Sequence, residues 1–245
     1  DVGAFVDMIK SNMDGLLSHA KMSYGRQIYL DGSGKLTNCG VTADSTTVNV
    51  ASTQYLVEGM TIDILDSTGE AVAGGTQRRV KSVNRTANTI LLDGATGVTT
   101  AATDFITEQG SYGKELTGME QIFKSTGTLY GLDRAVYSWL IPQMFGTVGA
   151  INDKAILNAE LQVENYTGGK IDFLSAAPDV YLNYGEYLEA TKRNVNTMTL
   201  DGGFTALNIA GVPLTYDKNI KAGKMEMLDT TQWTFHQLAD WDWMQ

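Results

Sequence analysis

The residue types that most often carry out catalysis are scarce in this chain. It contains two histidines, His19 and His236, and one cysteine, Cys39. Neither histidine lies in a His-Glu-x-x-His motif or in a close ligand pair, so the sequence predicts no zinc site and no histidine-based catalytic centre. A single cysteine also excludes a disulfide framework within one chain.

Three short patterns match the beginning of a chemical motif, and none matches a whole one. Ser18-His19-Ala20-Lys21 contains Ser-x-x-Lys, but it lies on a predicted helix face. The segment 110–115 has the glycines and lysine of a phosphate loop, but the spacing is too short and Glu115 replaces the magnesium-binding hydroxyl residue. Asp31-Gly32-Ser33-Gly34 begins like a calcium loop and lacks the later ligands, which indicates a turn. We therefore expect no catalytic residue, no cofactor and no bound metal.

Two groups of side chains are candidates for contacts between protein subunits. Trp241 and Trp243 would lie on one face of a strand, where indoles serve either core packing or a protein interface. Arg78, Arg79 and Lys81 form the other group, because they are expected to stay solvated or to touch a neighbouring subunit. The sequence leaves core packing open for the tryptophans.

The composition is typical of a folded, acidic protein. The chain has 245 residues, of which 43% are hydrophobic, and its net charge is −10. Basic residues do not cluster into the broad patch that non-specific DNA binding requires. No apolar run reaches the ~18 residues of a membrane span, and the first residues lack the pattern of a signal peptide.

The first segment is predicted to be one long helix. Val2, Phe5, Ile9, Leu16 and Tyr24 belong to a series of apolar residues at steps of three and four, so they share one face. We expect the face with Phe5, Ile9, Leu16 and Leu17 to be buried. The helix is expected to end at about Gly25.

Residues 46–108 are predicted to form a separate β module. Strand-like runs at 47–50, 60–65, 78–83, 89–92 and 104–107 alternate with turn formers, which favours a small barrel or sandwich. Its expected core is Ile62, Ile64, Val80, Ile90, Leu92 and Ile106. Because the segment lies between two unlike regions, we expect it to be a separate, inserted module.

The remaining sequence mixes helices and strands. Helical spacing appears at 148–162 and 180–193, and strand patterns appear at 170–174, 204–209, 212–216, 225–228 and 233–238. The predicted fold class is therefore α+β.

The order of the motifs resembles that of tailed-bacteriophage major capsid proteins with the Hong-Kong-97-like fold. The long helix leads into Arg26–Gly34, and Glu115-Leu116-Thr117-Gly118-Met119 follows the strand-rich segment. Leu129–Arg134 with Trp139, the strand and helix around Pro178, and Ala210-Gly211-Val212-Pro213-Leu214 also look like motifs of this family. The matches cover most of the chain outside 46–108.

The resemblance implies four parts of the chain. Residues 1–45 would be the spine helix and turn of the peripheral domain, 46–108 an inserted β domain, 109–218 the mixed α/β axial domain, and 219–245 a truncated return to the peripheral domain. The family's N-terminal arm would precede Asp1, and its final strands would follow Gln245. The inserted domain is not part of the minimal fold. Its flanks, Asp31–Gly34 and Glu115–Gly118, look adjacent in that fold, so the resemblance implies that the two ends of the insertion lie close in space.

The implied function is structural and not enzymatic. The chain would be a subunit of an icosahedral virion capsid that assembles in the host cytoplasm. Its partners would be other copies of itself, in pentamers and hexamers, which enclose DNA without sequence-specific binding and without a membrane. Three alternatives stay open: an encapsulin-like nanocompartment shell, a phage tail or decoration protein, and a phage-borne glycan hydrolase with paired carboxylates.

Overall fold

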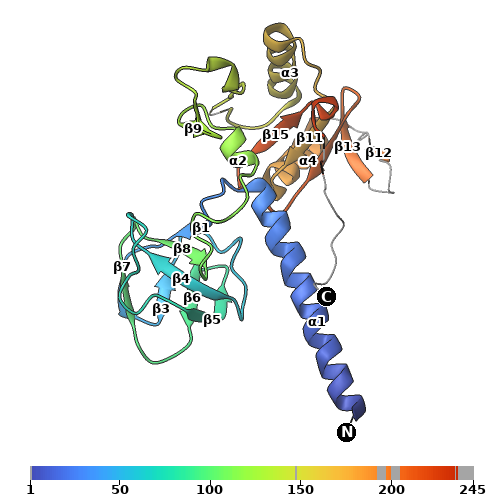
Figure 1. Ribbon diagram of the computed structural model, residues 1–245. Helices are drawn as coiled ribbons and strands as arrows, with labels where there is room; N and C mark the ends of the chain where they lie inside the picture. The colour runs from blue at the N-terminus through green and yellow to red at the C-terminus, as the bar shows by residue number, and fades with distance from the viewer. Residues whose placement is uncertain (1, 147, 192–196, 200–204, 235, 237–245) are drawn as a thin grey trace. The chain divides into compact units, whose positions relative to one another are not determined.

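The computed structural model describes residues 2–146, 148–191, 197–199, 205–234 and 236, with side chains from residue 7 onward except at 198, 199 and 205. The chain divides into two compact units, Asp1–Pro142 and Gln143–Gln245 (Figure 1). Helices and mainly antiparallel sheets occur in the chain, which confirms the predicted α+β class. Among the described residues, no helix combines the length and apolar character that a membrane span requires.

The first unit begins with α1 (Val2–Tyr29), the long helix that the sequence predicts. It ends at Tyr29, shortly beyond Gly25, because nothing in Arg26–Tyr29 breaks the helix earlier. The turn after it uses Gly32 and Gly34, whose φ angles are +83° and +80°. Both values lie in the left-handed region that favours glycine.

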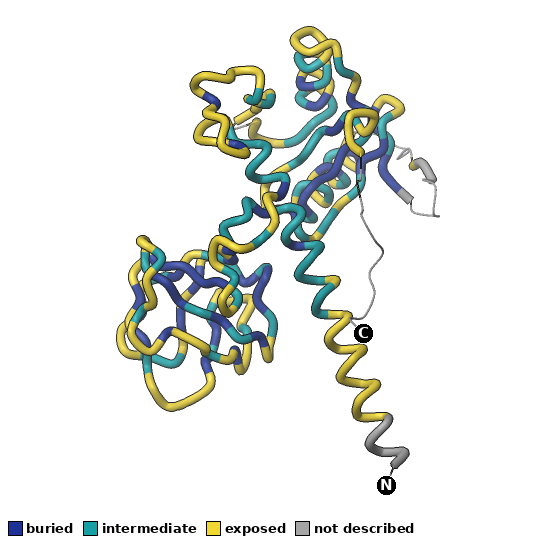
Figure 2. Tube along the Cα trace, in the orientation of Figure 1, coloured by how far each residue is buried: buried dark blue, intermediate teal, exposed yellow. Residues whose placement is uncertain are grey.

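The predicted burial of the α1 face is wrong within the single chain. Ile9, Leu16 and Leu17 are 41%, 59% and 39% exposed, and the side chain of Phe5 lies outside the described residues. Every side chain from residue 7 to residue 18 is exposed, as Figure 2 shows along the lower half of the helix. Apolar periodicity identifies the helix face that packs against other apolar side chains, but it does not specify whether those side chains belong to the same chain or to another molecule.

Eight short strands follow α1 and form the β module. They are β1 (Lys35–Asn38), β2 (Thr42–Ser45), β3 (Thr47–Asn49), β4 (Thr61–Leu65), β5 (Arg78–Asn84), β6 (Thr89–Leu92), β7 (Val98–Thr100) and β8 (Phe105–Glu108). Six of them make one sheet in the order β1-β8-β4-β5-β6-β3, and β2 pairs with β7. All of these pairings are antiparallel.

The six-stranded sheet closes on itself as a small barrel. Cys39 and Val50 form a bridge between the ends of its two outer strands. The amide of Gly40 donates to the carbonyl of Asn49 at 2.7 Å, and the amide of Ala51 donates to the carbonyl of Asn38 at 2.9 Å. Closure removes the free sheet edges that would otherwise invite pairing with other chains.

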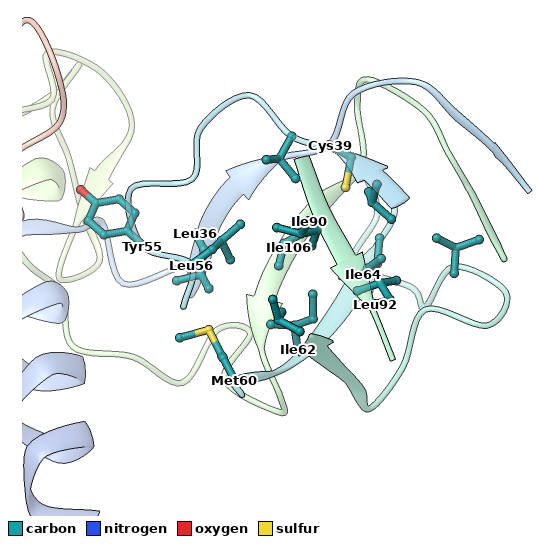
Figure 3. Packing of buried hydrophobic residues seen from close by; sticks show 14 of the residues in the cluster. Leu36, Cys39, Tyr55, Leu56, Met60, Ile62, Ile64, Ile90, Leu92 and Ile106 are labelled. Atoms are coloured by element: carbon teal, nitrogen blue, oxygen red, sulfur yellow. The ribbon is translucent and has the colours of Figure 1, made fainter. Parts of the chain in front are cut away.

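The barrel interior is the core that the sequence predicts. Ile62, Ile64, Ile90 and Ile106 are fully buried, and Val80 and Leu92 are nearly so. Figure 3 shows the labelled isoleucines pointing into the barrel together with Leu36 and Met60. Alternation along β4 and β6 places these side chains inward because successive residues of a strand face opposite sides.

The two ends of the module lie side by side. The amide of Gly113 donates to the carbonyl of Ser33 at 2.9 Å, and a Cβ at Gly34 would lie 2.8 Å from the carbonyl oxygen of Ser111. This is the arrangement expected of an insertion. The module is longer than the predicted 46–108, because β1 and β2 precede residue 46.

Short elements complete the first unit: α2 (Met119–Ile122), β9 (Thr128–Leu129), β10 (Leu132–Asp133) and the 3₁₀ turn η1 (Ser138–Leu140). Gly118, before α2, approaches the end of α1 very closely. A Cβ at Gly118 would collide with the carbonyl oxygens of Gln27, Ile28 and Leu30. Only glycine allows this backbone contact, which attaches the returning chain to α1.

The second unit is a five-stranded sheet with two helices. Its elements are α3 (Asp153–Thr167), β11 (Phe173–Ala176), α4 (Pro178–Thr191), β12 (Thr197–Thr199), β13 (Thr205–Ile209), β14 (Val212–Tyr216), β15 (Met225–Leu228) and the 3₁₀ turn η2 (Thr230–Gln232). The strand order is β12-β13-β14-β11-β15, with β11 parallel to β14. Ile156 of α3, Leu174 of β11 and Tyr184 of α4 share its core.

The two compact units do not follow the domain boundaries that the resemblance implies. The predicted division at 218 separates β14 from β15, whereas both strands pair with β11 in one sheet. The boundary between the compact units falls after Pro142, and the predicted division at 109 lies inside the first unit.

Candidate functional site

Arg78, one of the predicted interface residues, donates hydrogen bonds to backbone groups of the β module. Its guanidinium donates to the carbonyl oxygens of Gly74, Asp93 and Thr96 at 2.9, 2.8 and 3.0 Å. These carbonyls belong to two loops, so the arginine holds the loops together. Three of its five N–H donors therefore already have partners within the chain.

The other predicted interface residues differ in position. Arg79 and Lys81 are exposed on β5, where they alternate with the buried Val80. Trp241 and Trp243 lie outside the described residues. Arg79 and Lys81 thus remain free to meet another molecule, although two cations on one strand do not by themselves define a site.

The motif-like patterns have structural partners. The amide of Gly110 donates to the Asp63 carboxylate at 2.9 Å, so an acidic group occupies the place where a phosphate loop would hold its anion. His19 Nε2 lies 3.3 Å from Glu108 Oε1, on α1 and at the end of β8. Among the described residues, no group of three or more His, Cys, Asp or Glu side chains could hold a metal ion.

A buried ion-pair cluster joins α1 to the end of the barrel. The Arg26 guanidinium donates to both carboxylate oxygens of Glu115 at 2.7 and 3.0 Å and to Glu108 at 3.2 Å. Arg26 and Glu115 are almost fully buried, and the two-pronged geometry is the one that best compensates their desolvation. The arrangement fixes the two flanks of the module and leaves no open position for a substrate.

A second ion pair fixes the turn after α1. The Lys124 ammonium lies 3.0 Å from the Asp31 carboxylate, which also accepts hydrogen bonds from the amide and hydroxyl of Ser33. Burial by itself raises the pKa of Asp31, but the Ser33 hydrogen bonds and the Lys124 charge outweigh it and lower the pKa to about 2. Asp31 therefore stays ionised and acts as a structural anchor.

The first surface that could bind a partner lies on α1, and we call it the helix stripe. It consists of the exposed side chains of Met8, Ile9, Met13, Leu16 and Leu17. Their spacing places them along one side of the helix. Contiguous exposed apolar side chains of this kind mark a binding surface, because a monomer gains nothing by leaving them in water.

The second surface, which we call the aromatic loop, comprises residues 128–141. Tyr130, Val136 and Trp139 are 77%, 71% and 73% exposed, and Tyr137 is partly exposed beside Trp139 at a ring-centroid distance of 6.4 Å. Aromatic residues are enriched in the centres of protein interfaces, where charged residues are depleted. The loop carries two charged residues, Asp133 and Arg134, and Arg134 is buried.

Tyr130 holds an unfavourable backbone conformation at the tip of the aromatic loop. It joins β9 to β10 with Gly131, and the φ angles of the two residues are +50° and +82°. Asparagine and glycine suit this two-residue turn, whereas tyrosine is disfavoured there. A strained residue whose side chain is exposed contributes little to folding, so the strain suggests a binding role.

Arg134 makes the aromatic loop rigid. Its side chain is fully buried, and its guanidinium donates to the carbonyl oxygens of Gln121, Ile122 and Thr126 at 2.7, 3.3 and 3.4 Å. These carbonyls belong to α2 and to the segment just before the loop, so the buried Arg134 fixes the loop to the chain that precedes it. The exposed aromatic residues are presented without the entropy cost of ordering a flexible loop.

The sequence reasoning singled out neither surface as a contact site. The helix stripe was expected to be buried, and Leu129–Arg134 with Trp139 entered only as part of a resemblance. A usable signal was nevertheless present, since aromatic residues accumulate in a segment almost without charges. Comparisons with protein-family models, curated proteins and solved structures find no match to this chain.

Proposed function

We propose that this chain is a structural subunit of an icosahedral phage capsid that self-assembles into a shell around DNA. The observation that carries the proposal is the α1 segment 7–18, whose side chains are all exposed although several are large and apolar. Most of the stability of a helix in a protein comes from the packing of its apolar face, and this face is unpacked in the single chain. Such a helix suits a protein whose stable form is an assembly.

The order of elements supports a Hong-Kong-97-like fold for the proposed subunit. A long helix, a glycine turn and a returning chain at Gly118 form one connected region, and a β module is inserted between them. A mixed α/β unit with helices packed on its sheet follows. In this proposal α1 is the spine helix and the second unit belongs to the axial domain.

The inserted barrel would stabilise or decorate the shell surface. Its closed sheet offers no free edge for strand pairing, so its contacts would be made by side chains such as Arg79 and Lys81. The net charge of −10 suits a shell that encloses DNA without binding it tightly. We propose no enzymatic role, and we place the subunit in the virion after assembly in the host cytoplasm.

The test is electron microscopy of the purified protein after sedimentation. We expect closed particles of uniform size with pentamers and hexamers of the chain. A protein that stays monomeric at every concentration and salt condition would contradict the proposal. Particles that enclose a folded enzyme in place of DNA would support an encapsulin-like compartment instead, and tubes or isolated rings would support a tail protein.

A further inference from the structure

The helix stripe and the aromatic loop are two different apolar surfaces on the same unit. The stripe is a linear array of aliphatic and methionine side chains, and methionine adapts readily to the shape of a partner. The loop is a protrusion that presents Tyr130 and Trp139, residue types that often dominate binding energy. The helix stripe is therefore suited to receive large aromatic side chains from a partner, and the aromatic loop is suited to supply them.

The charges near both surfaces permit contact between identical chains. Acidic and basic residues are balanced around the stripe: Asp7, Lys10, Asp14 and Lys21. The loop has one acidic and one basic residue, of which the basic one is buried. In a chain of net charge −10 most surfaces of two copies repel each other, so neutral surfaces are where copies can meet.

We propose that the aromatic loop of one copy packs on the helix stripe of a second copy. The proposal rests on the proposed shell function, because it names the partner of α1 within the assembly. Tyr130 and Trp139 would insert between the side chains of Met13, Leu16 and Leu17. Each copy then gives one surface and receives one, which makes the contact heterologous.

A heterologous contact explains the presence of two unlike surfaces. A symmetric contact of stripe with stripe would leave Tyr130, Val136 and Trp139 in water, and a contact of loop with loop would leave the stripe uncovered. The pairing of unlike surfaces covers both. Repeated head-to-tail contacts close into rings where the rotation between copies divides a full turn, and rings are the units that a shell requires.

Cysteine cross-linking tests the geometry. Cys39 is buried at 3% exposure, so oxidation should be confined to introduced cysteines. Met13→Cys and Val136→Cys chains are assembled separately and as an equal mixture, and then oxidised mildly. We expect a disulfide-linked dimer in the mixture and none in either chain alone. Cross-linking of Met13→Cys with itself would overturn the proposal, because it would show a symmetric contact.

Matched substitutions test the energetics. Leu16→Gln removes an apolar side chain from the stripe, and Leu182→Gln changes a similarly exposed leucine of α4 in the second unit. Leucine and glutamine have similar helix propensities, so neither change should weaken its helix. We expect Leu16→Gln to lower the yield of assembled shells by ~10-fold or more, as the loss of an apolar residue from the centre of an interface does. We expect Leu182→Gln to leave the yield unchanged.

Tyr130→Asn tests the loop without the risk of unfolding. Asparagine fits the turn better than tyrosine, so the folded chain should be at least as stable. We nevertheless expect fewer shells. If the unchanged chain assembles and both Leu16→Gln and Tyr130→Asn give shells at the same yield, this inference is wrong while the shell function stands. If the unchanged chain never assembles, the shell function itself fails.

Discussion

Arg134 illustrates how a single buried residue can shape an exposed surface. Its guanidinium donates hydrogen bonds to the carbonyl oxygens of Gln121, Ile122 and Thr126. Lysine keeps the charge but lacks the planar fork, so Arg134→Lys should leave carbonyls poorly satisfied in the interior. We expect the free energy of unfolding to fall by about 2 kcal/mol in chemical denaturation. Arg79→Lys, on the exposed face of β5, serves as the control and should change it by less than ~0.5 kcal/mol.

Asp31 gives the stability of the chain a defined pH dependence. Its pKa is about 2 in the folded chain, below the ordinary value of 3.8, so the folded state binds the proton of Asp31 more weakly than the unfolded state does. Its stabilising contribution is therefore complete above about pH 4 and is lost as the pH falls towards 2. Asp31→Asn should reduce stability at neutral pH and flatten the pH dependence between 4 and 2. Thermal unfolding of both chains across this range is the measurement, and parallel curves would contradict the assignment.

At the scale of elements, the sequence predicts best where local signals agree. The strand at 89–92 is bounded by turn formers and alternates in burial, and β6 occupies the same residues. Lys35–Asn38 and Thr42–Ser45 were missed because each is a short run with one buried apolar or polar residue. Their strand structure comes from partners far along the chain, β8 and β7, which local patterns do not reveal.

The barrel should behave as an element that unfolds separately from the second unit. Ile106 is fully buried in the barrel, and its replacement by alanine should cost about 3 kcal/mol through lost burial and a cavity. Hydrogen exchange should show weakened amide protection from Lys35 to Glu108 and unchanged protection in β11 and β14. Leu214→Ala, in the second unit, should give the reverse pattern. Val41→Ala, at an exposed position, is the neutral control.

At the scale of the whole molecule, sequence patterns predict the elements and cores of the chain better than they predict what the exposed side chains contact. The class, the long helix and the barrel core followed from periodicity, because those features depend on residues of one chain. The burial of α1 did not follow, because periodicity marks an apolar face without specifying its neighbour, and Leu16 and Leu17 are exposed in the single chain. The hydrogen bonds of Arg78 to backbone carbonyls of two loops also did not follow, because a basic residue on a strand gives no sign of such partners.

The dependence of assembly on salt follows from the charge of the whole chain. Copies with a net charge of −10 repel one another, and the proposed contact is apolar and nearly neutral. Raising the salt shortens the screening length from ~30 Å at ~0.01 M to ~8 Å at ~0.15 M, so the repulsion weakens while the apolar contact does not. We expect light scattering to show faster assembly over this range, with a smaller gain for Leu16→Gln because its contact is already weakened. Assembly that slows as salt rises would mean that ion pairs between copies, such as pairs made by Arg79 or Lys81, hold the shell together.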